Sequence, residues 1–155
     1  MKRQNKILII LFIVLVLFDQ LTKILFTRQV IDLGILVLRP VTNTGISFGL
    51  FQGNNTLFTI ISAIFIVLLI LFRKEFKDNY VALTMILAGA TGNLIDRIIH
   101  GHVLDFIDFK IFPVFNVADS VITLGVATIL IKEIKTTYDN HKKTKKPKKK
   151  KQTKK

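Results

Sequence analysis

The chain contains no cysteine. This absence excludes disulfide bonds, thiolate catalysis, thiolate metal sites and lipid attachment to a cysteine of the chain itself. Acidic residues are also scarce, with 10 Asp and Glu against 23 Lys and Arg, which gives a formal net charge of +13. A charge of this size is common in nucleic-acid-binding proteins, but here most of the excess lies after Tyr138. The charge therefore indicates a basic tail and not a basic folded domain.

We assign residues 139–155 to this Lys-rich tail and residues 1–138 to a single domain. A run of like charges is expected to be disordered. On the cytoplasmic side of a membrane, each lysine near anionic headgroups would gain about 1 kcal/mol of attraction. A solvated tail that only enforces topology is the simpler interpretation. RNA binding has no support from aromatic residues or motifs, so we expect no nucleic-acid partner.

Half of the residues are hydrophobic, and they form long blocks instead of short periodic stripes. Four such blocks occur, at residues 7–26, 57–72, 80–99 and 117–134. Their lengths approach the roughly 20 apolar residues that a membrane-spanning helix needs. The first block lacks a signal-peptide cleavage motif, so we expect a retained anchor. The sequence therefore predicts an all-α membrane protein built as a four-transmembrane-helix bundle.

The basic residues predict the orientation of this bundle. The N-terminus, the short loop at 73–79 and the tail hold most of the Lys and Arg. Both termini should therefore be cytoplasmic and both longer loops extracytoplasmic, in a multi-pass protein of the cell (inner) membrane. The first longer loop contains a β-rich tract at residues 35–41, followed by turn residues. It predicts a small sheet on the outer surface, within about residues 27–56.

Several polar residues fall inside the predicted spans. Asp19 lies roughly 18 Å along the first helix, where an unpaired carboxylate costs at least ~2.5 kcal/mol. Lys23 follows four residues later on the same helical face and can pair with it. Asn93, Asp96 and Arg97 share a face at the outer end of the third span. A structural ion pair and a structural clamp are the simpler interpretations of these two groups.

Asp105 and Asp119 lie near the outer ends of the third and fourth spans. The loop between them contains Pro113 and can bring the two carboxyl groups together. Two adjacent carboxyl groups share a proton, because both cannot ionise cheaply. Such a pair can activate water for peptide hydrolysis without a cofactor. Acidic residues in loops are usually solvated, so spacing alone leaves this hypothesis open.

Other chemistries have weaker support. His100, His102 and Asp105 suggest a metal site, but an H-x-H pair in a loop is a weak signal, and we expect no metal. Ser47 and Ser120 do not lie in a G-x-S-x-G nucleophile elbow. Ser120 is better placed to support the start of the fourth helix.

Five segments of the chain resemble motifs of type II signal peptidase, the lipoprotein signal peptidase family of bacteria. They are D-Q-L-T-K (19–23), N-T-G-I-S-F (43–48), G-N-L-I-D-R (92–97), G-H-V-L-D-F (101–106) and F-N-V-A-D-S (115–120). They occur in family order and extend across about two thirds of the chain. Five segments in register make the resemblance specific.

The resemblance implies an aspartyl endopeptidase. Its substrates would be lipid-modified prolipoproteins, cleaved immediately before the cysteine that carries diacylglycerol, and it would need no cofactor. The catalytic pair would be Asp105 and Asp119, at the extracytoplasmic face. Other positions match family residues that shape or support the site: Asp19, Lys23, Asn43, Gly45, Asn93, Asp96, Arg97, Asn116 and Ala118.

The family fold implied is a four-helix membrane bundle with a small extracytoplasmic β-cradle. Membrane lipids are further expected partners, and one bundle suffices, so we expect a monomer. Two departures stand out: Phe112 replaces a tryptophan of many members, and the Lys-rich tail has no counterpart in the motifs. Two alternatives remain. The first is a small four-helix transporter or assembly factor, and the apolar second and fourth spans disfavour a transporter. The second is an RNA-binding protein that would require its tail.

Overall fold

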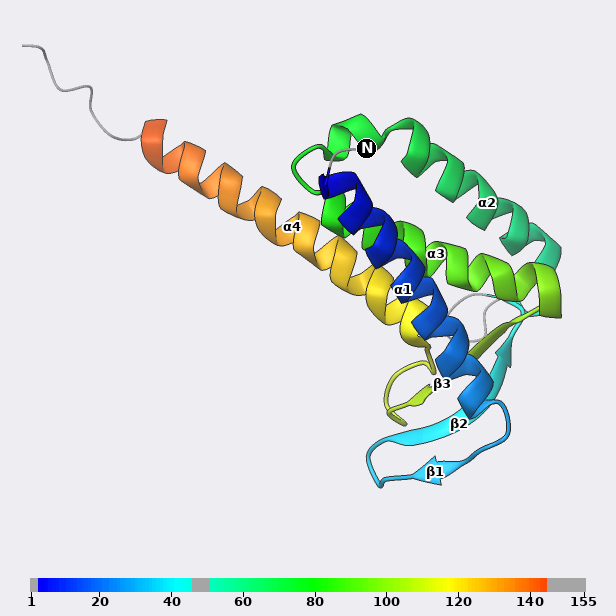
Figure 1. The fold of residues 1–155 in the computed structure, drawn as a ribbon. Helices are drawn as coiled ribbons and strands as arrows, with labels where there is room; N and C mark the ends of the chain where they lie inside the picture. Colours follow the sequence, from blue (N-terminus) through cyan, green and yellow to red (C-terminus); the bar gives the residue numbers. More distant parts are fainter. Residues whose placement is uncertain (1–2, 46–50, 145–155) are drawn as a thin grey trace, which may run out of the picture.

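The computed structural model describes residues 3–45 and 51–144. Four helices form a bundle, and a small sheet lies at one end of it (Figure 1). The elements in chain order are α1 (Arg3–Phe26), β1 (Ile31–Asp32), β2 (Val37–Asn43), α2 (Asn55–Leu71), the short 3-10 helix η2 (Arg73–Phe76), α3 (Tyr80–His100), β3 (Val103–Asp108) and α4 (Val117–Thr144).

The helices coincide with the four apolar blocks of the sequence, with one difference in length. The fourth block was expected to end at residue 134 and the domain at residue 138, but α4 continues to Thr144. Residues 139–144, which we expected to be disordered, are therefore helical. The rest of the predicted tail, residues 145–155, lies outside the described residues.

Apolar character differs among the four helices. Within the described residues, α1 and α3 are long and apolar enough to cross a membrane, and α2 is a shorter apolar helix of 17 residues. The apolar part of α4 also carries Asp119, Lys132 and Glu133. Large hydrophobic side chains of α1 and α2 are widely exposed, and α2 buries none of its residues. An apolar surface of this extent is suited to contact with lipid.

Helix α3 lies at the centre of the bundle, in contact with α1, α2 and α4. Small residues allow the close approach of α3 and α4. A Cβ atom at Gly125 would lie 2.8 Å from Cγ1 of Ile86 and 2.9 Å from the carbonyl oxygen of Ala82. A Cβ atom at Gly89 would overlap the carbonyl oxygen of Ala118. Both positions therefore require glycine at this helix spacing.

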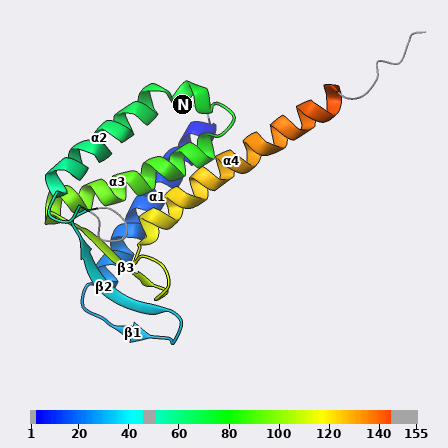
Figure 2. The same cartoon turned by 180° about the vertical axis from the view of Figure 1, so that it is seen from behind.

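The sheet is antiparallel, in the order β1-β2-β3. It lies at the end of the bundle where α1 ends and α4 begins, as both views show (Figures 1 and 2). The predicted strand in the first outer loop is confirmed as β2. The third strand was not foreseen, because it comes from residues 103–108, outside the expected range of 27–56. We expected Asp105 to lie in a loop, but it lies in strand β3.

Strand β3 is brought to the sheet by the end of α3. Gly101 has a φ of +75°, a left-handed conformation that ends the helix and turns the chain toward β3. In the register of β2 and β3, Asn43 lies opposite Val103, and Val41 lies opposite Asp105. Because side chains two residues apart point to one face of a strand, Asn43 and Asp105 share a face. The sheet thus positions Asp105 beside the helix bundle.

Candidate active site

The start of α4 fixes the position of the Asp119 carboxylate. Asn116 caps the helix, since its Oδ1 accepts a hydrogen bond of 2.9 Å from the backbone N–H of Asp119. In return, Oδ2 of Asp119 accepts a hydrogen bond of 3.3 Å from the backbone N–H of Asn116. This reciprocal pair is a capping box, a local structure that short polar residues three positions apart favour. The sequence N-V-A-D therefore both begins the helix and orients its carboxylate.

Asp105 is 2% exposed, and its carboxylate accepts two amide hydrogen bonds. Nδ2 of Asn43 donates to Oδ2 over 3.0 Å, and Nδ2 of Asn116 donates to Oδ1 over 2.7 Å. Burial, followed by the charge of Asp119, raises the pKa of Asp105 to about 7, although the two amide donors act in the opposite direction. Near neutral pH, Asp105 is therefore able to hold or release a proton.

Asn116 connects the two acids, because its side chain donates to Asp105 while its backbone N–H donates to Asp119. Both carboxylates line one cavity of about 650 Å³. Other polar lining residues are Asn43, Gly45, Asn93, Arg97, Ser120 and Thr123. Most of the remaining wall is apolar and comes from Val103, Phe112, Pro113, Val114, Phe115, Ile122 and Leu124. The cavity thus combines two coupled acids with a surface suited to an apolar ligand.

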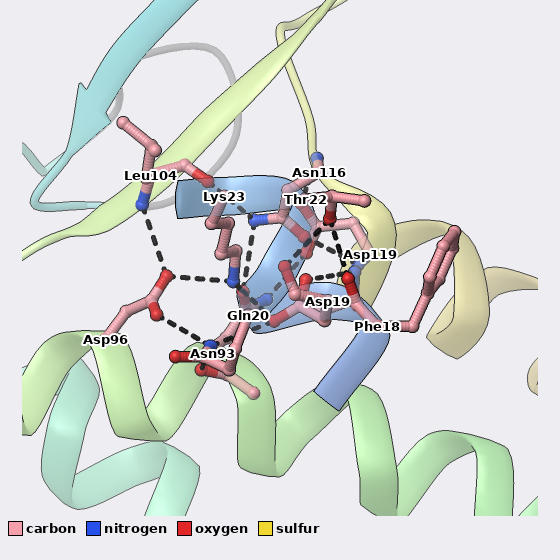
Figure 3. A network of polar contacts seen from close by, with 12 residues as sticks. Phe18, Asp19, Gln20, Thr22, Lys23, Asn93, Asp96, Leu104, Asn116 and Asp119 are labelled. Atoms are coloured by element: carbon pink, nitrogen blue, oxygen red, sulfur yellow. Dashed lines mark hydrogen bonds and ion pairs between the residues drawn. The ribbon is translucent and has the colours of Figure 1, made fainter. Parts of the chain in front are cut away.

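A buried ion cluster lies beside this cavity (Figure 3). Nζ of Lys23 is 2.8 Å from Oδ2 of Asp19 and also 2.8 Å from Oδ2 of Asp96. All three side chains are buried, with residue exposures between 1% and 4%. Removing one member of such a group would leave an uncompensated buried charge. The ion pair expected between Asp19 and Lys23 is therefore confirmed, and it is shared with Asp96.

The cluster also orients the amide of Asn93. Oδ1 of Asn93 accepts hydrogen bonds from Nζ of Lys23 (3.0 Å) and Nδ2 of Asn116 (3.1 Å). Its Nδ2 consequently points to Asp119 and donates to Oδ1 over 2.8 Å. With its oxygen held by two donors, the amide cannot flip without losing all three bonds. Lys23 thus acts on Asp119 through Asn93.

The two acids of the cluster hold the elements that carry the cavity aspartates. Oδ1 of Asp19 accepts a hydrogen bond of 2.9 Å from the backbone N–H of Ala118, at the start of α4. Oδ2 of Asp96 accepts a bond of 3.3 Å from the backbone N–H of Leu104, in β3. A Cβ atom at Gly92 would overlap Oδ2 of Asp19, so glycine is needed there. The cluster therefore joins α1 and α3 to both catalytic candidates.

All of the site residues expected from the sequence gather at this end of the bundle. The two not yet described, Gly45 and Arg97, form the rim of the cavity with Asn43. The Gly45 N–H donates to Oδ1 of Asn43 over 3.0 Å, and Nη2 of Arg97 donates to the Gly45 carbonyl over 3.3 Å. Ser120 donates from Oγ to the carbonyl of Asn116 over 3.0 Å, which is a structural contact.

Among the residues considered for other chemistries, those that the structure describes do not assemble into a second site. Ser47 lies outside the described residues. The rings of His100 and His102 are 6.2 Å apart. Across residues 3–45 and 51–144, no group of three or more His, Asp or Glu side chains is arranged to hold a metal ion.

Sequence reasoning missed one member of the network, Gln20. Its Nε2 is 3.1 Å from Oδ2 of Asp19, 2.9 Å from Oδ1 of Asp96 and 3.2 Å from the carbonyl oxygen of Gly92. Gln20 therefore supplies a neutral donor to both acids that pair with Lys23. A third polar residue in one turn of an apolar helix was the signal that could have found it.

Comparison with known proteins finds relatives that align with most of the chain. The profile described as Signal peptidase (SPase) II matches residues 11–135. The lipoprotein signal peptidase of Thermodesulfovibrio yellowstonii is 41% identical over 137 residues, covering 81% of this chain and 92% of that protein. The lipoprotein signal peptidase of Staphylococcus aureus (strain Newman) is 38% identical over 154 residues, covering 90% of this chain and 93% of that protein.

Two solved structures, both described as bacterial membrane enzymes, have the same fold. The first has a TM-score of 0.76 at 34% identity and covers 96% of this chain and 95% of its own. The second has a TM-score of 0.72 at 35% identity, and the match covers 84% of this chain and 94% of the other. These matches, together with the membrane-length helices, identify a membrane enzyme. The chain belongs to the signal peptidase II family, whose members are aspartic peptidases.

Proposed function

We propose that this protein is a lipoprotein signal peptidase in which Asp105 and Asp119 form the catalytic pair. The observation that carries the assignment is the shared cavity, where the two carboxylates face a common space and are joined through Asn116. The proposed reaction is hydrolysis of a prolipoprotein immediately before the cysteine that carries diacylglycerol. The names of the relatives in T. yellowstonii and S. aureus support this choice of substrate.

In the proposed mechanism, the two carboxyl groups hold one proton between them. The ionised member takes a proton from a water molecule, which attacks the scissile carbonyl carbon. The protonated member donates to the developing oxyanion and then supplies a proton to the leaving amine. The hydrogen bonds from Asn43, Asn93 and Asn116 keep both carboxylates in place during these transfers. No step requires a cofactor.

The apolar wall of the cavity supports an apolar substrate. The apolar lining comes from the loop residues Phe112, Pro113, Val114 and Phe115 and from Ile122 and Leu124 of α4. A signal peptide and a diacylglyceryl group are both apolar, so their burial against this wall would gain about 25 cal/mol per Å². Phe112 retains an aromatic ring where many family members have tryptophan.

We further propose that all four helices span the inner membrane, with cytoplasmic termini and the sheet as an extracytoplasmic β-cradle. Helix α2 is about 25 Å long, at the lower end of the spanning range. In α4, about 20 Å separates Asp119 from Lys132. Lys132 contacts the carbonyl of Asp78, in the short loop between η2 and α3. This contact supports an inner boundary at Lys132 and a site near the outer one.

The test uses the purified full-length protein in lipid vesicles with a diacylglyceryl-modified precursor. Asp105→Asn and Asp119→Asn should each lower kcat by at least about 10³-fold, because either change removes one proton-transfer group. Thermal unfolding should stay cooperative in both variants. Asp32→Asn, an exposed acid of the same sheet, is the matched control and should retain activity. Normal turnover by either cavity variant would refute the catalytic pair.

A further inference from the structure

The C-terminal part of α4 forms a surface that the proposed peptidase activity does not use. Residues 131–144, here named the α4 extension, continue the helix for about 18 Å beyond Lys132. In both views α4 diverges from α1 and α2 toward this end and leaves the bundle (Figures 1 and 2). Every residue from Ile131 to Lys142 is exposed. Apart from the contact of Lys132 with the carbonyl of Asp78, the extension therefore lies away from α1 and α2.

The extension is amphipathic. Ile131, Ile134 and Tyr138 recur at positions i, i+3 and i+7, which places them in one stripe along the helix. Their exposures are 67%, 69% and 66%, so no described part of the protein covers the stripe. Lys135 and Lys142 each follow a stripe residue by four positions and border the same face. Asn140 lies on the opposite face, two residues from Tyr138.

We propose that the α4 extension binds the anionic phospholipid surface of the inner leaflet. The apolar stripe would lie at the boundary between headgroups and acyl chains, and the bordering lysines would pair with lipid phosphates. A basic amphipathic helix with an aromatic residue in its apolar stripe is the type of segment that binds such an interface. The proposal rests on the cytoplasmic position of the C-terminus that we proposed above.

Two further observations favour lipid over a protein partner. First, the stripe is continuous with the exposed apolar surface of α4 at Leu124 and Leu130, which the proposed topology places in the membrane. Second, most of residues 145–155 are lysine, so the sequence that follows the extension adds positive charge. Clusters of basic residues immediately after a membrane span are attracted to anionic lipid headgroups.

The absence of tryptophan allows a direct test. Tyr138→Trp introduces a single fluorophore into the stripe, and Asn140→Trp places one on the opposite face as the matched control. Each full-length variant is reconstituted in vesicles of phosphatidylcholine with or without phosphatidylglycerol, and with acyl chains brominated to quench nearby tryptophan. Neither position belongs to the active site, so peptidase activity serves as the folding control.

We expect the emission of the Tyr138→Trp variant to shift to shorter wavelength when phosphatidylglycerol is present. Quenching by brominated chains should then be at least about twofold stronger at position 138 than at position 140, because only the stripe enters the interface. Adding Lys135→Gln and Lys142→Gln to Tyr138→Trp should remove the response to phosphatidylglycerol. Equal quenching at the two positions, or identical emission in both lipids, would overturn the proposal. Identical emission with and without phosphatidylglycerol would make an acidic protein the next candidate for the partner that covers the stripe.

The lipid-binding experiment measures fluorescence and not turnover. Its result is therefore independent of the experiment that tests the catalytic pair. Loss of the lipid response would leave the catalytic pair untouched. Activity in the Asp105→Asn or Asp119→Asn variant would likewise leave the lipid response of the extension unaffected.

Discussion

The two ends of the helix bundle are held together by different kinds of contact. At the end that carries the sheet, α1, α3, α4 and β3 meet through buried charged and amide side chains. Toward the opposite end, α3 and α4 meet through small residues, with Gly125 against Ala82. Of the buried polar side chains described, only Thr84 lies there, and its hydroxyl donates to the carbonyl of Tyr80.

This difference separates catalysis from helix association. A transporter would need polar groups that continue to the inner side, and in the described residues the buried charged and amide side chains are confined to one end. The residues of the polar end depend on one another, because two buried carboxylates share a single cation, Lys23. The apolar end depends mainly on shape. Substitutions at the two ends should therefore fail in different ways, which the following experiments test in order of decreasing effect.

The largest effect is expected for Lys23→Met. Loss of the ammonium leaves Asp19 and Asp96 as buried carboxylates without their cation, which costs about 3–5 kcal/mol of unfolding free energy. Activity should be lost as well, because the Asn93 amide loses the donor that orients it toward Asp119. Chemical denaturation in detergent, followed by circular dichroism, measures the change in stability.

Lys110→Met is the matched control for this experiment. Nζ of Lys110 is 3.6 Å from Oδ2 of Asp32, and both side chains are about half exposed or more. Such a pair contributes at most about 1 kcal/mol. If Lys23→Met were as stable as Lys110→Met, the buried cluster would not stabilise the polar end.

The pH dependence of turnover should be set by groups at the polar end of the bundle, above all by Asp105. Burial and the charge of Asp119 raise the pKa of Asp105 to about 7. As pH rises above this value the pair loses its shared proton, so kcat should fall about tenfold per pH unit. Pre-steady-state cleavage of a labelled precursor, measured across the pH range at which the protein remains folded, tests this prediction.

The same pKa shift has a defined effect on stability. The folded protein binds a proton at Asp105 between pH 3.8 and about 7, where the unfolded chain releases it. The contribution of Asp105 to stability therefore decreases as pH rises through this window. Asp105→Asn should remove that part of the pH dependence of stability. If the variant kept the same dependence of unfolding free energy on pH, the proton bound in this window would belong to another group.

Two glycine substitutions, one near each end of the bundle, should have effects of intermediate size on stability and turnover. Gly125→Ala places a methyl group against Ile86 and the Ala82 carbonyl, which should cost about 1–3 kcal/mol of stability. Its kcat should stay within about twofold of the unsubstituted protein, because the added methyl group faces α3 and Gly125 lies about 9 Å along α4 from Asp119. Thermal unfolding and turnover are measured on the same preparation.

Gly89→Ala should behave differently although the chemical change is identical. The added methyl group would press on the carbonyl of Ala118, whose N–H is bound by Asp19. We expect a similar loss of stability together with about a tenfold loss of kcat, since displacement of the α4 start moves Asp119. Equal kinetics in the two variants would show that the ends are not separable in this way.

The ends also differ in how well the sequence predicts them. Apolar blocks report helices directly, so α1, α2 and α3 were placed to within a few residues. The end of α4 was missed because charge runs suggest disorder, whereas Lys and Thr residues beyond Ile134 continue the helix to Thr144. Strand β3 was missed because its pairing partner, β2, lies about sixty residues earlier in the chain, and short-range patterns carry no information on such pairing.

At the site, the motifs placed the expected residues at the correct end, but not their connections. The sequence suggested pairing of Asp19 with Lys23 through their four-residue spacing. The sharing of Lys23 with Asp96 and the amide bridge through Asn116 depend on the packing of three helices and a strand. Gln20 was overlooked because its partners are as far as 76 residues away in the chain.

The smallest effect is expected from removing residues 145–155. Thr144 lies about 38 Å along α4 from Asp119, several times the Debye length of about 8–10 Å at physiological salt. The charges beyond it are therefore screened from the catalytic pair, and kcat/KM should change by less than about twofold in detergent. The α4 extension stays intact in this variant, so its lipid contact should weaken only through the loss of neighbouring lysines. A large decrease in kcat would mean that the basic end of the protein acts on the chemistry at the opposite end, and the separation between the two ends would not hold.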